Sequence, residues 1–263
     1  MRCCPIEKFR RLFFVAILLG CQFASVHAAS AERVEVLFTA ASEAELKPLL
    51  EQMQSVRSES RAAWQFWLGT IAGKPVVLTR TEGDPLNAVA ATTLAIRRYS
   101  PKLVVTFGSA RAHDPALRPG DLLVSEKFTA FDGVISDFAP LGGGSDSLKW
   151  SKLPHLLATT GEKETPAYFF PADATALALA KTLVAPRGKT VVGVLGSAAQ
   201  VNREADRIAR IRALWSSSSE DGESAHVAGC AQLLGVPVVG LRVIDGAEGE
   251  AGAIAAKFME GLK

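Results

Sequence analysis

The sequence predicts an α/β fold, either as one large domain or as two small ones. Residues 103–107 and 190–195 form short, continuous apolar runs of the kind found in strands buried on both faces. Residues 44–54 instead carry apolar side chains at helical spacing. The chain has 263 residues, of which 48% are hydrophobic, so it can bury a sizeable core.

The same patterns predict the remaining elements in chain order. Strands are expected at residues 34–38, 64–70, 75–79 and 122–125, and helices at residues 89–99, 172–184, 203–215, 221–234 and 253–262. The strand at 103–107 is expected to stop at Gly108-Ser109-Ala110, because small residues end it there. Residues 216–219 are expected to be a polar linker, and residues 133–172 show no clear periodicity.

The N-terminus has the features of an export signal. Basic residues precede an apolar run too short for a permanent transmembrane helix, and Val26-His27-Ala28 has the small-residue pattern of a cleavage site. We therefore expect residues 1–28 to be a signal peptide and residues 29–263 a periplasmic domain. Leu18-Leu19-Gly20-Cys21 also resembles a bacterial lipobox, which would make Cys21 a lipid anchor, so both kinds of processing stay open.

Charge and cysteine content exclude several classes of protein. Residues 1–28 hold four of the 29 basic and one of the 27 acidic residues, so the rest of the chain is about neutral. No basic stripe with interleaved aromatic residues suggests a nucleic-acid partner. Cys230 is the one cysteine beyond residue 28, and the histidines are scattered, so neither a disulfide nor a metal site is expected.

Residues 101–132 carry the first functional signal. The buried strand leads into Gly108-Ser109-Ala110, where small residues let a ligand approach the backbone. A turn at Arg118-Pro119-Gly120-Asp121 then leads into a second strand that ends in Ser125-Glu126. This ordered set resembles the nucleoside phosphorylase/nucleosidase superfamily, and especially its methylthioadenosine/S-adenosylhomocysteine nucleosidase branch.

The C-terminal part of the chain supports this resemblance. The family has a glutamate at the start of a helix and an arginine 19 residues later, as Glu223 and Arg242 stand here. The resemblance implies that Glu223 accepts hydrogen bonds from ribose hydroxyls and that Arg242 lines the site. Two departures stand out. Gly222 replaces a methionine, and the catalytic aspartate occurs one position early, as Asp245, so either Asp245 is the acid or the acid is lost.

The resemblance also implies the other site residues. Glu43 matches the carboxylate that positions the attacking water; Glu45 is the neighbouring candidate, and an acidic residue that complements the helix N-terminus is the alternative for Glu43. Gly108 and Ser109 are expected to bind substrate. Gln200 and Val201 are expected beside the base. The family has an aromatic residue at position 200, and a glutamine cannot stack in the same way, which puts adenine specificity in doubt.

Several positions favour water over phosphate as the nucleophile. Glu82 and Asp84 replace glycines of a family loop, and two carboxylates would repel phosphate. Thr106 stands where phosphorylases of the superfamily carry a phosphate-binding arginine. Arg111 replaces a glycine, and it either holds an anionic ligand or is a solvated side chain.

Taken as a whole, the resemblance implies a three-layer α/β/α sandwich with a central mixed sheet. The expected function is a nucleosidase that hydrolyses the N-glycosidic bond of a purine nucleoside, methylthioadenosine- or S-adenosylhomocysteine-like, without phosphate, metal or organic cofactor. A purine nucleoside phosphorylase and a non-catalytic nucleoside- or base-binding protein are the alternatives. Family members are commonly dimers, so a homo-oligomer with a small-molecule nucleoside as ligand is expected.

Overall fold

The computed structural model describes residues 32–161 and 163–263. The predicted signal peptide, its cleavage site and the lipobox cysteine Cys21 lie outside the described residues. Within these two ranges, no helix is both long and apolar enough to cross a membrane.

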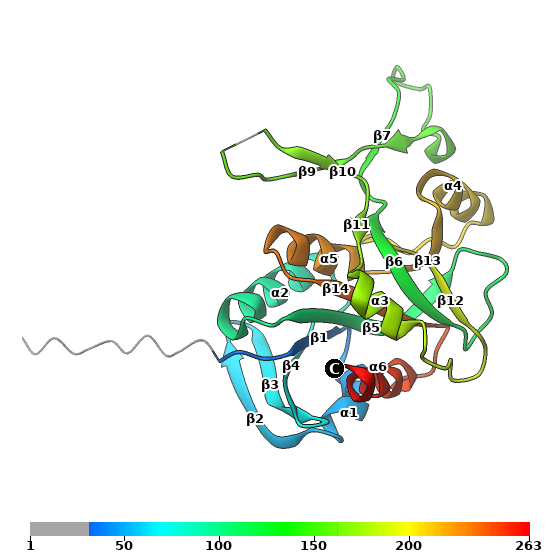
Figure 1. Ribbon diagram of the computed structural model, residues 1–263. Helices are drawn as coiled ribbons and strands as arrows, with labels where there is room; N and C mark the ends of the chain where they lie inside the picture. The colour runs from blue at the N-terminus through cyan, green and yellow to red at the C-terminus, as the bar shows by residue number, and fades with distance from the viewer. Residues whose placement is uncertain (1–31, 162) are drawn as a thin grey trace, which may run out of the picture. The chain divides into compact units, whose positions relative to one another are not determined.

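The described part of the chain alternates between strands and helices (Figure 1). The strands are β1 (Val36–Ala40), β2 (Gln54–Arg61), β3 (Trp64–Ile71), β4 (Lys74–Arg80), β5 (Leu103–Ala112), β6 (Leu122–Ala130), β7 (Val134–Ile135), β8 (Ser151–Lys152), β9 (His155–Leu157), β10 (Thr165–Ala167), β11 (Phe170–Pro171), β12 (Thr190–Ser197), β13 (Ser217–Asp221) and β14 (Val238–Ile244). The helices are α1 (Glu43–Leu50), α2 (Pro85–Tyr99), α3 (Ala174–Ala180), α4 (Ala205–Trp215), α5 (Ser224–Leu233) and α6 (Glu250–Gly261), with a 3₁₀ turn η1 (Ser147–Lys149).

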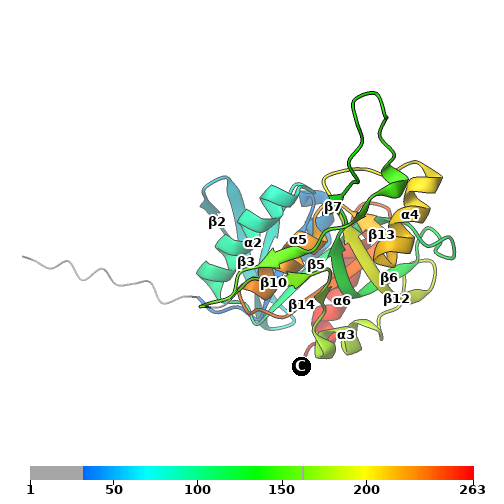
Figure 2. The same ribbon diagram turned by 90° about the horizontal axis from the view of Figure 1, so that it is seen from above.

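A ten-stranded mixed sheet forms the middle layer. Its order is β11-β6-β12-β13-β5-β1-β4-β3-β2, and β14 pairs with both β5 and β6. Strands β5, β14, β6, β12 and β13 therefore close into a ring, because each pairs with two of the others. Helices α2 and α5 cover one face, and α1, α3 and α6 cover the other (Figure 1, Figure 2). The predicted three-layer sandwich with a mixed sheet is confirmed.

Strand β1 shows how the sequence builds both outer layers. Val36, Phe38 and Ala40 belong to the core cluster shared with α1, α3 and α6, whereas Leu37 belongs to the cluster shared with α2 and α5. Successive strand side chains point to opposite faces, so a strand covered on both faces is a continuous apolar run. The same property identifies β5 and β12 in the sequence.

Three local predictions were wrong. Strand β5 does not stop at Gly108-Ser109-Ala110 but continues to Ala112, because β14 and β13 pair with this part of it. The supposed linker at 216–219 belongs largely to β13, whose serines are stabilised by pairing with β12 and β5 rather than by apolar pattern. The helix at 44–54 ends at Leu50, and the polar, exposed edge strand β2 begins at Gln54.

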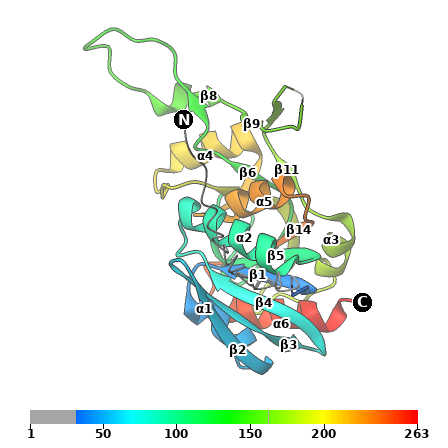
Figure 3. The ribbon, with the colours of Figure 1, turned by 90° about the vertical axis from the view of Figure 1, so that its left-hand side faces the viewer.

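Residues 131–169 leave the sheet and return to it. Within this range, residues 131–161 and 163–169 form the two-stranded pairs β7-β8 and β9-β10, and Figure 3 shows the chain between β7 and β8 extending away from the sheet. The carboxyl ends of β1, β12, β13 and β14 lie together, beside the last residues of β5. Ligands of open α/β sheets bind outside strand ends of this kind, so this convergence places the candidate site.

Candidate active site

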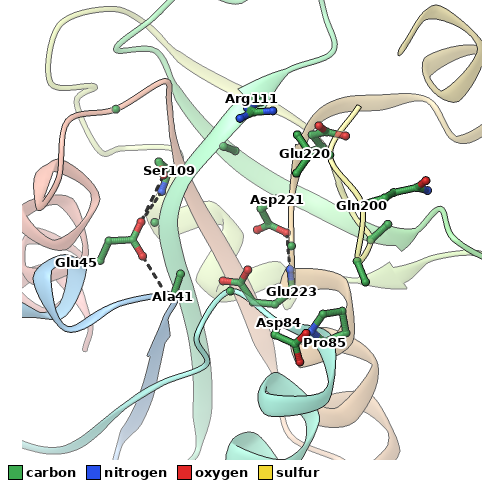
Figure 4. A pocket seen from close by; sticks show the side chains of 18 of the residues that line it. Ala41, Glu45, Asp84, Pro85, Ser109, Arg111, Gln200, Glu220, Asp221 and Glu223 are labelled. Atoms are coloured by element: carbon green, nitrogen blue, oxygen red, sulfur yellow. Dashed lines mark hydrogen bonds between the residues drawn. The ribbon is translucent and has the colours of Figure 1, made fainter. Parts of the chain in front are cut away.

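A cavity of about 550 Å³ opens where these strand ends meet (Figure 4). Its volume is in the range of small-molecule sites. Its walls come from the residues after β1, β12, β13 and β14, from β5 and from the loop before α2. Six of the eight predicted site residues line it, namely Gly108, Ser109, Gln200, Val201, Glu223 and Asp245.

Glu45, and not Glu43, is the carboxylate that α1 presents to the cavity. One Glu45 oxygen accepts from the Ala41 amide at 3.0 Å, and the other accepts from the Ser109 amide at 2.9 Å. Glu43 does not line the cavity; its side chain is 61% exposed and lies 3.8 Å from Arg80. Positions two apart on a helix point about 200° away from each other, so only one of them can face the site. The sequence pattern did not distinguish them.

Gly108 lets the Glu45 carboxylate lie against strand β5. A Cβ atom at this position would stand 2.7 Å from one Glu45 oxygen and 2.9 Å from the other, closer than contact distance allows. The backbone of Gly108 also has a φ of 152°, which other residues rarely adopt. The glycine and Ser109 therefore position a carboxylate in addition to facing the cavity.

Arg242 lies behind the cavity wall, so the prediction that it lines the site was wrong. Its side chain is 1% exposed. Its Nε donates to Asp221 at 2.7 Å, and its Nη2 donates to Thr106 at 3.0 Å and to Glu223 at 3.4 Å. Thr106, at the position of the phosphorylase arginine, is fully buried and serves as a partner of Arg242. We call Asp221, Glu223 and Arg242 the buried charge cluster.

The buried charge cluster holds two carboxylates and one guanidinium. Burial alone would raise the pKa of Asp221, but Arg242 and the hydroxyls of Ser197 and Ser224 hold that pKa below its ordinary value. Burial, together with the neighbouring Asp221 charge, raises the pKa of Glu223 to about 8. Glu223 therefore keeps its proton through most of the neutral range, at the surface where a ligand would contact it.

The structure explains why glycine stands at position 222, where the family has a methionine. A Cβ atom there would lie 2.1 Å from the carbonyl oxygen of Gly83, so the loop before α2 occupies the space that a side chain would need. In this loop Asp84 lines the cavity while its carboxylate accepts from the amides of Leu86 and Asn87 and caps α2. Glu82 turns away from the cavity and pairs with Arg80 at 2.9 Å.

Asp245 follows β14 directly and lines the cavity mouth. Its φ is 41°, a left-handed conformation that costs energy for a residue other than glycine. The Asp245 amide donates to the Ala110 carbonyl at 2.9 Å, which fixes this turn against β5. The family has its aspartate at the position of Gly246. The turn nevertheless holds Asp245, one position earlier, at the cavity.

Sequence reasoning missed Glu220 and Asp221, which also line the cavity. They lie at the end of β13, whose sequence Ser-Ser-Ser-Glu-Asp has no apolar alternation to mark a strand. With them, the cavity-lining side chains comprise one guanidinium, Arg111, and six carboxylates, namely Glu45, Asp84, Glu220, Asp221, Glu223 and Asp245. In residues 32–161 and 163–263, no group of three or more histidine, cysteine, aspartate or glutamate side chains is arranged to hold a metal ion.

The chain is similar to known proteins both in sequence and in fold. A family model described as the phosphorylase superfamily matches residues 35–261. A 5′-methylthioadenosine/S-adenosylhomocysteine nucleosidase of Marinomonas sp. is 28% identical over 201 residues, which cover 75% of this chain and 79% of the relative.

Solved structures share the fold. The 5′-methylthioadenosine/S-adenosylhomocysteine nucleosidase of Neisseria meningitidis, in complex with methylthio-immucillin-A, has a TM-score of 0.71 at 21% identity and covers 87% of this chain and 99% of that one. The futalosine hydrolase of Helicobacter pylori has a TM-score of 0.68 at 20% identity and covers 87% of this chain and 96% of that one.

The raised pKa of Glu223 predicts how stability depends on pH. A carboxyl whose pKa rises from 4.5 in the unfolded chain to about 8 in the folded one stabilises the fold fully below pH 4.5 and loses that contribution as pH rises to 8. We expect the melting temperature of the wild type to fall relative to that of Glu223→Gln between pH 5 and 8.5. The fall should be roughly 2–4 °C for each kcal/mol of unfolding free energy that is lost as Glu223 ionises. The exposed Glu43→Gln variant should follow the wild type. A difference between wild type and Glu223→Gln that is constant with pH would contradict the assignment.

Proposed function

Because the model of the phosphorylase superfamily matches residues 35–261, the chain belongs to that superfamily, and we propose that it is a nucleosidase that hydrolyses the N-glycosidic bond of purine nucleosides without phosphate. The observation that carries this proposal is the Glu45 carboxylate, fixed by two main-chain amides and directed into the same cavity as Glu223 (Figure 4). A carboxylate with both oxygens already oriented is suited to hold and deprotonate a water molecule.

The proposed mechanism uses three carboxyl groups. Glu223 binds the sugar hydroxyls. Glu45 holds the water that adds to C1′ and takes its proton. The electron pair of the C1′–N9 bond leaves with the purine, which receives a proton from Asp245. Such a reaction passes through an oxocarbenium-like transition state, and negative charge around the sugar favours that state.

The charge of the cavity supports water rather than phosphate as the nucleophile. Six carboxyl groups and one guanidinium line the cavity. Even with Glu223 protonated and Asp245 as the acid, the remaining carboxylates outnumber the guanidinium, and phosphate would have to enter against that field. The position of the phosphorylase arginine is occupied by Thr106, which is buried behind the wall. Arg242, behind that wall, already donates to Asp221 and Glu223.

An assay of base release tests the proposal. We expect free base from the wild type in phosphate-free buffer, with no gain on adding phosphate. Glu45→Gln should lose about 10²- to 10⁴-fold in kcat, because it removes the proton acceptor. Glu43→Gln is the matched control and should retain the wild-type rate. Release that requires phosphate would make the protein a phosphorylase, and ligand binding without release from any nucleoside would make it a binding protein.

We also propose that the protein is exported, either free in the periplasm or anchored through Cys21. The support is the sequence of residues 1–28. Mass spectrometry of the protein recovered from periplasmic and membrane fractions should give an N-terminus at Ala29, or a lipid-modified N-terminal Cys21 in the membrane fraction. An intact Met1 on protein in the cytoplasm would contradict export.

We propose further that the protein forms a homodimer through α2 and α5. Leu86 and Leu233 are 82% and 51% exposed, and Val89 and Leu234 beside them are also exposed. Apolar side chains clustered in this way mark interaction surfaces. Light scattering should give a dimer for the wild type and a monomer for Leu86→Asp. Leu141→Asp, at a fully exposed leucine outside both helices, should leave the dimer intact. A monomeric wild type would exclude the proposal.

A further inference from the structure

Arg111 is a charged group in the cavity that the proposed mechanism does not use. It is the one cationic side chain among those that line the cavity, and it is exposed to solvent there. Among the described residues, no carboxylate oxygen lies within 4.0 Å of its guanidinium, since none of the ion pairs found there includes it. A guanidinium in a cavity with six carboxylates would ordinarily pair with one of them, so its lack of a partner needs an explanation.

The explanation lies in Glu220, which is the residue opposite Arg111 across the β5-β13 pair. Opposite charges at such positions normally interact. Both Glu220 oxygens are already occupied: one accepts from the Asn202 amide at 3.1 Å, and the other accepts from the Asn202 side chain at 2.7 Å and lies 3.0 Å from His113. Burial would raise the pKa of Glu220, but His113 and Asn202 hold it below its ordinary value. The carboxylate is thus turned away, and Arg111 stays available to a ligand.

The two ends of the cavity differ in chemistry. Glu45 and Glu223 offer carboxyl oxygens, which suit the hydroxyls of a sugar. Arg111 lies two residues beyond Ser109 on the same face of β5, about 7 Å further along the strand. Figure 4 shows Arg111, together with Glu220, away from Asp84 and Pro85 at the other end. A nucleoside with its sugar between Glu45 and Glu223 can therefore extend its base toward Arg111.

The guanidinium of Arg111 is a planar fork of N–H groups, so it donates hydrogen bonds and accepts none. A 6-oxopurine presents two acceptors, O6 and N7, side by side on one edge, whereas adenine presents the N7 acceptor beside a donating amino group. The fork can bond both atoms of the first edge and one atom of the second. On bond cleavage, the electron pair of the C1′–N9 bond spreads onto N7 and O6 of a 6-oxopurine, where a guanidinium stabilises it. Arg111 contributes charge only. Because its fork bonds O6 and N7, the proton that Asp245 supplies in the proposed mechanism goes to another ring nitrogen of the leaving base, N3 or N9.

We infer that Arg111 makes this site selective for nucleosides of 6-oxopurines, such as hypoxanthine and guanine, over nucleosides of adenine. The inference rests on the proposed nucleosidase function and names its substrate class. A bidentate arginine contact discriminates between bases by about 5- to 150-fold, which sets the size of the expected preference.

Two pairs of substrates that differ only in the 6-position test the inference: inosine with adenosine, and 5′-methylthioinosine with 5′-methylthioadenosine. We expect the wild type to favour the 6-oxo member of each pair in kcat/KM by about 5- to 150-fold. Arg111→Met should bring the ratio close to one by lowering the 6-oxo rate alone. Arg111→Lys, which keeps the charge without the fork, should give an intermediate ratio.

Arg33→Met is the matched control, because Arg33 is an exposed arginine before the amino end of β1, and it should keep the wild-type ratio. A wild-type preference for the adenine member, or an equal loss on both members in Arg111→Met, would overturn the inference and leave the nucleosidase function standing.

If no nucleoside is cleaved, the proposed function fails, and binding of the free bases still decides the inference. Calorimetry should then show tighter binding of hypoxanthine than of adenine by the wild type, and no such difference in Arg111→Met. Equal binding of the two bases by the wild type would refute the inference independently of catalysis.

Discussion

Two buried carboxylates share one guanidinium, and the candidate site depends on this arrangement. Arg242 of β14 bonds Asp221 at the end of β13, Glu223 before α5 and Thr106 of β5. Asp221 in turn accepts from Ser197 of β12. A buried charge without partners is strongly destabilising, so these groups hold four strands and a helix in one arrangement. Burial raises the pKa of Glu223, the neighbouring Asp221 charge raises it further, and Arg242 offsets only part of this rise.

The backbone positions the Glu45 carboxylate. Glu45 is held by the amides of Ala41 and Ser109, which requires that strand β5 have no side chain at Gly108. Gly222 permits a comparable approach by the Gly83 carbonyl. Both glycines therefore allow chain segments that are distant in sequence to lie in direct contact around the cavity. The two carboxyl groups differ in their surroundings: Glu45 accepts from two main-chain amides, whereas Glu223 is buried beside the Asp221 charge, and its pKa is raised.

Departures from the family pattern occur in more than one wall of the cavity. Asp84 and Gly222 stand where the family has a glycine and a methionine, and both lie at the loop before α2. Arg111 and Gln200 differ from the family in the wall around Glu220. Glu220 links these changes, because its contacts with Asn202 fix the loop that carries Gln200 and at the same time leave Arg111 without a partner.

The sequence by itself determined the strands that are buried on both faces, the three-layer fold through the family resemblance, and the presence of Gly108, Ser109 and Glu223 at the cavity. These features depend on local composition or on short motifs. Only the tertiary structure decided that Glu45 rather than Glu43 faces the cavity and that Arg242 lies behind its wall. It also decided that the polar segment Ser217–Asp221 is a strand, since pairing with β5 and β12 forms it. Local patterns record how apolar each face of a segment is, whereas the rotation of a helix about its axis and the partner of a polar strand are set by contacts between residues far apart in the chain.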